Sequence, residues 1–294
     1  MSRLLFPILM FCATACVEEV GLFNGEDARR LIVIDAAVST ADSLQYVYIS
    51  HGGEWSEPDE VFRDAIYDIV DTRLVTLTDD LGRVDTFDVS PNGRICTLAR
   101  PDLSPGRTYR LDVLVGSRHF YAVQAMRPHP IAEGIRFVRR LTKDDEIYTP
   151  VFYFRDAEPD VVNYYIFSPR FSVMAREGAV HQYPPIMLLS DARLYEVVDG
   201  VELSNGLGGG GDDRGYWGEI NFASRGFYSY ALSSVSREVY DYYAALERQI
   251  TSDGGVYQTA PATPRTNFVG DNVQGLFVAA DTYEFRGPIS FPMQ

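Results

Sequence analysis

Short stretches of hydrophobic residues, several of them alternating with polar ones, recur along the first half of the chain. They include LIVIDAAV at 31–38, QYVYIS at 45–50 and RICTL at 94–98. Alternation is typical of a β-strand with one buried face, because successive side chains of a strand point to opposite sides. No helical periodicity separates these stretches. Short strands at this spacing predict a β-sandwich.

Two β-hairpins are predicted within this region. Residues 73–89 alternate through Leu74, Thr76 and Thr78 up to a turn at 79–82, which contains glycine and two aspartates. Residues 108–125 alternate again and turn at Gly116-Ser117, and one face of the outgoing strand carries Tyr109, Leu111, Val113 and Val115. Glycine and aspartate favour the tight turns that join antiparallel strands.

The second half opens after RPHPI at 127–131, where two prolines favour extended backbone and indicate a junction. Further strands are predicted within 134–141, 148–154, 161–167, 186–200 and 268–285. One amphipathic helix is predicted over 234–250, because hydrophobic side chains recur there at steps of three or four, namely Val235, Val239, Tyr242, Leu246 and Ile250. The glycine-rich stretch 206–215 lacks the lysine and hydroxyl of a phosphate-binding loop, so we expect a mobile loop.

The amino terminus has the pattern of a lipoprotein signal peptide over residues 1–15. Arg3 precedes an apolar run at 4–11, and the small residues 13–15 lead directly to Cys16. The run is shorter than the roughly 20 residues of a membrane-spanning helix. We expect cleavage before Cys16, which is then lipidated, and a tether over 16–30. An ordinary secretory signal, a buried first helix and lipidation at Cys12 are the alternatives.

Charge and cysteine content limit which partners and which disulfides are expected. The formal net charge is −15 and the pI about 4.7, which argues against nucleic acid and against adsorption to anionic lipid. Once Cys12 is removed and Cys16 is lipidated, Cys96 is left without a disulfide partner. We expect Cys96 to fill core space rather than to react.

Catalytic and metal motifs give little support to an enzyme. The chain has no GxSxG, and its histidines are scattered, at His51, His119, His129 and His181. Acidic groups could supply oxygen ligands to calcium, namely Asp79-Asp80, Asp144-Asp145-Glu146, Asp156 with Asp160, and Asp212-Asp213. None follows the EF-hand pattern, and aspartates in turns are more often hairpin residues. We therefore expect no catalytic residue, metal or cofactor. A glycosidase with paired carboxylates stays open, because sequence does not show their separation.

An ordered set of phrases resembles one family of outer-membrane lipoproteins of Bacteroidota-type bacteria, the domain-of-unknown-function 4249 family. The phrases are the cysteine at 16, PGRTYRLDV with RHFYAVQAMRPHPI, FRDAEPDVVNYYIF, LLSDARLYEVVDG, and YDYYAALERQI followed by PRTNFVGDNVQGLFVAA. The resemblance implies a mainly β protein: an amino-terminal immunoglobulin- or transthyretin-like β-sandwich, here residues 31–128, and a larger β-rich domain with one helix, here 129–294. Genes of such proteins commonly lie beside TonB-dependent receptors. Glu18 and Glu19 resemble the signal that sends lipoproteins to the outer face of the outer membrane.

These observations together predict a lipid-anchored accessory protein of the outer membrane, facing the exterior. It is expected to bind a nutrient and to assist a TonB-dependent receptor without catalysis. The candidate stacking residues for a ligand are the aromatic side chains Tyr164, Tyr165, Tyr216 and Trp217. The alternatives are a surface hydrolase and a structural or adhesive envelope protein.

Overall fold

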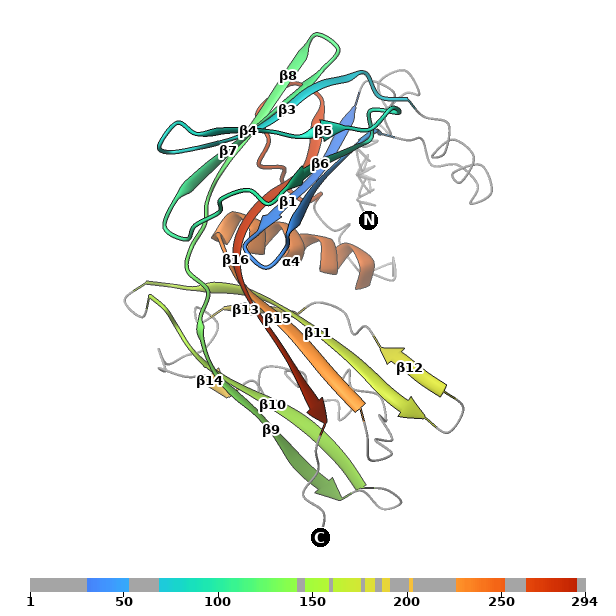
Figure 1. The fold of residues 1–294 in the computed structure, drawn as a ribbon, viewed down its shortest axis with the longest axis vertical. Helices are drawn as coiled ribbons and strands as arrows, with labels where there is room; N and C mark the ends of the chain where they lie inside the picture. The colour runs from blue at the N-terminus through green and yellow to red at the C-terminus, as the bar shows by residue number, and fades with distance from the viewer. Residues whose placement is uncertain are drawn as a thin grey trace, which may run out of the picture.

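The protein is mainly β, as predicted, with one helix among the described residues (Figure 1). The computed structural model describes residues 31–52, 69–141, 146–158, 161–175, 178–182, 187–190, 201–202, 226–251 and 263–289. Its strands form a nine-stranded sheet, a four-stranded sheet and a three-stranded sheet. The signal peptide, the tether and the glycine-rich stretch 206–215 lie outside the described residues.

Two sheets face each other in the amino-terminal part and form the predicted sandwich. One layer contains β1 (Ile32–Ser39), β2 (Leu44–His51), β5 (Asp88–Val89) and β6 (Ile95–Ala99). The other has the order β4-β3-β7-β8, with β3 (Thr72–Asp79), β4 (Val84–Thr86), β7 (Thr108–Val115) and β8 (Arg118–Ala125). Their inward side chains form one buried cluster, which includes Ile34, Val47, Cys96, Val75, Leu111 and Phe120. This burial of alternate residues is why the period of two in the sequence predicted the sandwich.

Both hairpins are confirmed, with one difference in the first. Strands β3 and β4 join through the turn at 79–82, and β7 and β8 join through Gly116-Ser117. In β7 the predicted face is buried. In β3 the buried residues are Val75, Leu77 and Asp79, whereas Leu74 is exposed.

The remaining strands build the second half of the molecule. The nine-stranded sheet continues as β12-β11-β15-β16, with β11 (Tyr164–Ala175), β12 (Gly178–Gln182), β15 (Gly226–Val235) and β16 (Val273–Ile289); β13 (Met187–Ser190) pairs with β11 beside this path. The three-stranded sheet contains β9 (Ile131–Leu141), β10 (Glu146–Arg155) and β14 (Val201–Glu202). Phe154 of β10 packs edge-on against Tyr165 of β11, with 5.3 Å between ring centroids. Strand β15 was not predicted from the sequence.

Strand β16 joins the two halves into one continuous sheet. Its first part pairs in parallel with β1, from Val273 to Ala280, and its second part pairs antiparallel with β15, from Asp281 to Ile289. Figure 1 shows it running from the upper sandwich down to the lower strands. The chain therefore returns at its carboxyl end to complete the first sheet. The proposed boundary between 128 and 129 remains a prediction, but residues 268–280 pack or pair with the amino-terminal sandwich.

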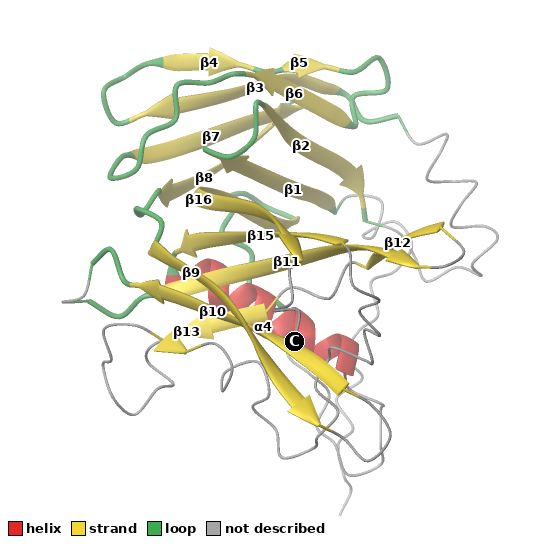
Figure 2. Ribbon diagram, turned by 60° about the horizontal axis from the view of Figure 1, so that its bottom comes forward, coloured by secondary structure: helices red, strands yellow, loops and turns green. Residues whose placement is uncertain are grey.

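The predicted helix is α4 (Arg237–Thr251), and it begins two residues after β15 ends. Ser236 caps it, because its hydroxyl accepts the Val239 backbone N–H at 3.3 Å. Val239 and Tyr240 are buried against Leu276 and Val278 of β16. Figure 2 shows the helix beside β11 and β13, which it also contacts. Val235, assigned to the helix by its spacing, is the last residue of β15, because strand pairing with Tyr164 extends that far.

Candidate functional site

The predicted stacking residues do not form an open surface in the described part of the chain. Tyr165 is 2% exposed, and its hydroxyl donates to the buried carboxylate of Asp156. Tyr164 is half-buried and packs against Tyr240 of α4. Tyr165 is therefore a core residue rather than a stacking surface, since strand alternation puts it on the face that β10 covers. Tyr216 and Trp217 lie outside the described residues.

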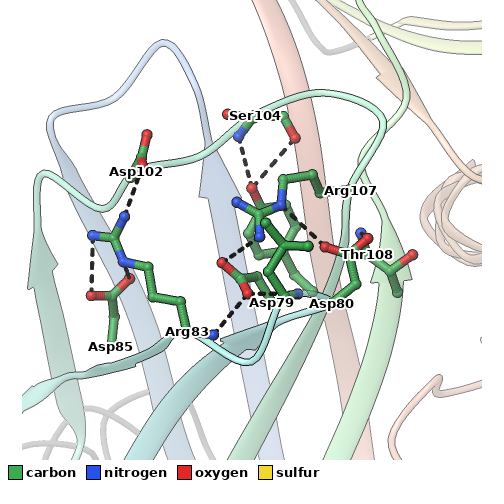
Figure 3. A network of polar contacts seen from close by, with 10 residues as sticks. Asp79, Asp80, Arg83, Asp85, Asp102, Ser104, Arg107 and Thr108 are labelled. Atoms are coloured by element: carbon green, nitrogen blue, oxygen red, sulfur yellow. Dashed lines mark hydrogen bonds and ion pairs between the residues drawn. The ribbon is translucent and has the colours of Figure 1, made fainter.

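The turn of the first hairpin holds a network of polar contacts (Figure 3). Asp79 accepts backbone N–H groups from Leu81 and Arg83 at 2.9 Å each, and its second oxygen forms a 2.7 Å ion pair with Arg107. The same guanidinium donates to Asp80 at 3.1 Å, and this hydrogen bond holds the pKa of Asp80 below its ordinary value. Arg107 thus occupies the position where a cation would bind Asp79-Asp80, so these aspartates stabilise the turn.

The other candidate acidic groups and the histidines either have polar partners or have side chains outside the described part of the structure. Burial tends to raise the pKa of Asp112, but hydrogen bonds from Arg110 and His119 outweigh it and leave that pKa below its ordinary value. His129 lies near Asp281 at the junction of the two halves. Asp160, 144–145 and 212–213 lie outside the described residues. Within the described ranges no group of three metal-ligating side chains is close enough to hold an ion.

An exposed row of aromatic and aliphatic side chains lies on the outward face of β2 and β6. Its members are Leu44, Tyr46, Tyr48 and Ile95, with exposed fractions of 37, 40, 48 and 39%. The rings of Tyr46 and Tyr48 are nearly parallel, at 8°, with 5.9 Å between their centroids. Single exposed hydrophobic residues are common on protein surfaces, whereas contiguous ones mark interaction sites. We call this row, together with Asp35, the tyrosine face.

Asp35 lies on β1 directly opposite Tyr48. Asp35 is exposed to solvent as a residue. The surrounding protein nevertheless buries part of its carboxyl group, and this burial raises the pKa of that group above the ordinary value. On its other side are Tyr242 and Tyr243 of α4, whose pKa values are raised by burial and then by the negative charge of Asp35. Desolvation disfavours a charge, so a carboxylate here is poised to gain from a ligand that compensates it.

A cavity of about 250 Å³ adjoins the tyrosine face at Tyr48. Arg94 and Asn92 line its polar part, and Ile95 lines its apolar part. The Nε of Arg94 is buried and has no hydrogen-bond partner among the described residues. Tyr48 is therefore next to a hydrogen-bond acceptor, Asp35, and also lines a cavity whose wall includes the donor side chains of Arg94 and Asn92. This is the arrangement of polar groups around an apolar surface that ligand sites commonly have.

A second hollow, of about 210 Å³, lies on the same side of the sheet where β1, β11, β15 and β16 meet. Its floor consists of small side chains such as Ala37, Ser39 and Ser233. Ala37 is opposite Tyr46, so the hollow begins beside the tyrosine face. The hydroxyls of Ser39 and Ser233 are both bonded to Thr282, at 3.0 and 2.8 Å.

Alternation in the sequence predicted the strand that carries Tyr46 and Tyr48 but gave no sign of their role. In QYVYIS the tyrosines alternate with Val47 and Ile49, and either set could face the core. The structure buries the aliphatic set. The signal for a surface role was a pair of aromatic residues on the strand face opposite two β-branched ones.

Cys16 lies outside the described residues, so its lipidation stays a prediction. In the described part of the chain, no helix has the length and hydrophobicity needed to cross a membrane.

Comparison with known proteins gives one family match. The model of a family described as Domain of unknown function (DUF4249) matches residues 21–286. A search of curated proteins gave no match. Among solved structures, the chain is similar at 14% identity to a DUF4785 family protein from Legionella pneumophila, covering 69% of this chain, with a TM-score of 0.25. The match spans about half of that protein, 52% of its length.

Proposed function

Because this chain belongs to the DUF4249 family, we propose that it is a non-enzymatic, lipid-anchored binding protein of the outer membrane that assists a TonB-dependent receptor in nutrient capture. The anchor is Cys16, and the ligand-binding surface is the tyrosine face. The single observation that carries a binding role is the exposed parallel pair Tyr46 and Tyr48 beside the partly desolvated carboxylate of Asp35. Exposed aromatic rings with a few polar groups near them are typical of binding surfaces.

The envelope location rests on the residues around Cys16. A short apolar run and small residues before the cysteine favour cleavage and lipidation, and several acyl chains make attachment durable, because each buried methylene contributes about 0.8 kcal/mol. The acidic pair Glu18-Glu19 supports export to the outer face. The supporting observation for a receptor partner is the resemblance described above.

Replacing Cys16 by serine tests the anchor. We expect the Cys16→Ser variant to leave the membrane fraction, because it has no thiol to carry acyl chains. The measurement is fractionation of cells followed by immunoblotting, with Cys96→Ser as a control that keeps the anchor and sediments with membranes. If the Cys16→Ser protein sediments with lipid as the wild type does, the lipid anchor is wrong.

The receptor partnership is tested separately, by purification from outer membranes in mild detergent at native expression. We expect a TonB-dependent receptor to be recovered with the protein. Purification without any such receptor contradicts the accessory role.

A further inference from the structure

The carboxylate of Asp35 has no cationic partner in the described part of the chain, a feature that it shares with Asp42 and Asp88 but not with most aspartates of the sandwich. Other aspartates of the sandwich are paired with arginine: Asp71 with Arg73, Asp79 and Asp80 with Arg107, Asp85 and Asp102 with Arg83, and Asp112 with Arg110. In the described part of the chain, the Asp35 carboxylate has neither an ion pair nor a hydrogen bond. Yet burial raises its pKa, which means that protein atoms already displace part of its hydration. No described residue therefore supplies a compensating positive charge to Asp35.

Aromatic rings stand on both sides of this carboxylate. Tyr48 is its cross-strand neighbour on β2. Tyr242 and Tyr243 of α4 pack against the cluster that contains Leu276, the cross-strand neighbour of Asp35 on β16. Burial and the charge of Asp35 raise the pKa of Tyr243 to about 12, so this phenol stays neutral at physiological pH. The face of a neutral phenol attracts an ammonium or guanidinium group through its quadrupole. Rings and carboxylate together suit a cation better than a sugar, whose hydroxyls hydrogen-bond but carry no compensating charge.

The cavity beyond Tyr48 favours a hydrogen-bond acceptor on the ligand rather than a cation. Arg94 and Asn92 line this cavity, and either side chain can donate a hydrogen bond to a backbone carbonyl oxygen. A peptide with a basic side chain carries both groups on one chain: a cation for Asp35 and a carbonyl for Arg94. The formal charge of −15 also attracts basic peptides over long distances, although salt weakens that attraction.

We propose that the tyrosine face binds a peptide segment through a lysine or arginine side chain, which lies against Tyr48 and pairs with Asp35. This rests on the proposed function, since it names the ligand class of the same surface. Asp35 then selects the charge of the ligand, Tyr48 provides the aromatic wall, and Arg94 holds the peptide backbone.

The test is isothermal titration of the detergent-solubilised full chain at about 0.15 M salt, where long-range attraction is screened beyond roughly 8 Å. The probes are tetralysine amide, tetraglycine amide and maltotetraose. We expect tetralysine to bind and the other two to bind much more weakly. Asp35→Asn should weaken tetralysine binding about tenfold, since it removes the charge and keeps the shape. Tyr48→Leu should weaken it about threefold, whereas Tyr48→Phe should retain it, because the ring is kept.

Asp271→Asn is the matched control. Asp271 is an exposed aspartate in the turn before β16, and its side chain carries no ion pair in the described structure. This variant loses the same formal charge away from the tyrosine face, so its binding should stay within about twofold of wild type. Lowering the pH should also weaken tetralysine binding as Asp35 gains a proton, and Asp35→Asn should lose part of that pH dependence. Thermal melting of each variant shows that its fold is intact.

Three outcomes overturn the proposal. If Asp35→Asn and Asp271→Asn lose the same amount of tetralysine affinity, tetralysine is attracted only by the overall charge of the protein. Stronger binding of maltotetraose or tetraglycine than of tetralysine shows that the face takes a neutral ligand. Absence of tetralysine binding removes the cationic ligand class. None of these affects the Cys16→Ser fractionation or the recovery of a receptor, so failure of this inference is distinguishable from failure of the proposed function.

Discussion

At the scale of single residues, alternation along a strand decides which side chains are available. Tyr165 and Tyr48 are both tyrosines in strands, yet one is 2% exposed and the other 48%. The difference arises because β10 covers the face of β11 that carries Tyr165, whereas Tyr48 is on the outward face of the sandwich. Sequence alone identified both strands. It could not assign the faces, because tyrosine is stable in either environment.

Cys96 gives a prediction at this scale. It is fully buried in β6, and burial raises the pKa of its thiol to about 11, so the reactive thiolate is scarce at neutral pH. We expect Cys96 in the mature protein to resist a thiol-labelling reagent at pH 8 and to react fully in denaturant. The measurement is mass spectrometry after labelling. Rapid labelling of the folded protein would contradict the interpretation of Cys96 as a core residue.

At the scale of elements, the strand-to-helix transition at 235–237 shows where periodicity misleads. Val235 and Val239 are both buried in one cluster, and their spacing of four residues resembles one face of a single helix. However, Val235 is held by pairing with Tyr164 in the sheet, and the helix starts only after the Ser236 cap. Of the predicted stripe, Val235 and Val239 are buried, whereas Tyr242 and Leu246 are half-buried. Spacing therefore predicted two buried residues correctly, placed one of them in the wrong element, and left out the buried Tyr240.

The close approach of β1 and β16 gives a prediction for Gly275. This residue has φ of 108°, and a Cβ atom added to it would lie 1.9 Å from the carbonyl oxygen of Ile34. Gly275→Ala should therefore lower the free energy of unfolding by at least about 2 kcal/mol, from strain and clash together. Urea unfolding followed by circular dichroism measures the loss.

Gly82→Ala is the control for that experiment. Gly82 has φ of 83° but open space around its Cβ position, so only backbone strain is added, at a cost of about 1 kcal/mol. Equal destabilisation by the two substitutions would show that the contact between β1 and β16 is looser than described.

At the scale of the whole molecule, a buried polar network fixes the junction where β16 passes from one half to the other. Asp281 is 6% exposed and accepts the Thr40 hydroxyl at 2.6 Å and the His129 backbone N–H at 2.8 Å. Ser234 donates to the carbonyl of Pro128 at 2.7 Å. The proline-rich segment that the sequence marked as a junction is therefore held against β15 and β16.

Asp281→Ala should destabilise the whole fold. It leaves the Thr40 hydroxyl and the His129 N–H without their acceptor, which we expect to cost about 2 kcal/mol in the free energy of unfolding. Glu284→Ala, which removes a carboxylate paired with the exposed Arg286, should change stability by no more than about 0.5 kcal/mol. Urea unfolding of both variants makes the comparison. Similar losses in the two would mean that the network does not hold the halves together.

The sequence by itself determined the strands of the sandwich, its hairpin turns, helix α4 and the burial of Cys96. These depend on short-range patterns: alternation, turn residues and helical spacing. Only the tertiary structure decided that β16 pairs with β1, residues more than two hundred positions apart, and that α4 brings Tyr242 and Tyr243 to Asp35. No local pattern encodes these contacts, because they arise when distant segments bury their hydrophobic faces together. The tyrosine face therefore became visible as a candidate site only after the chain had folded.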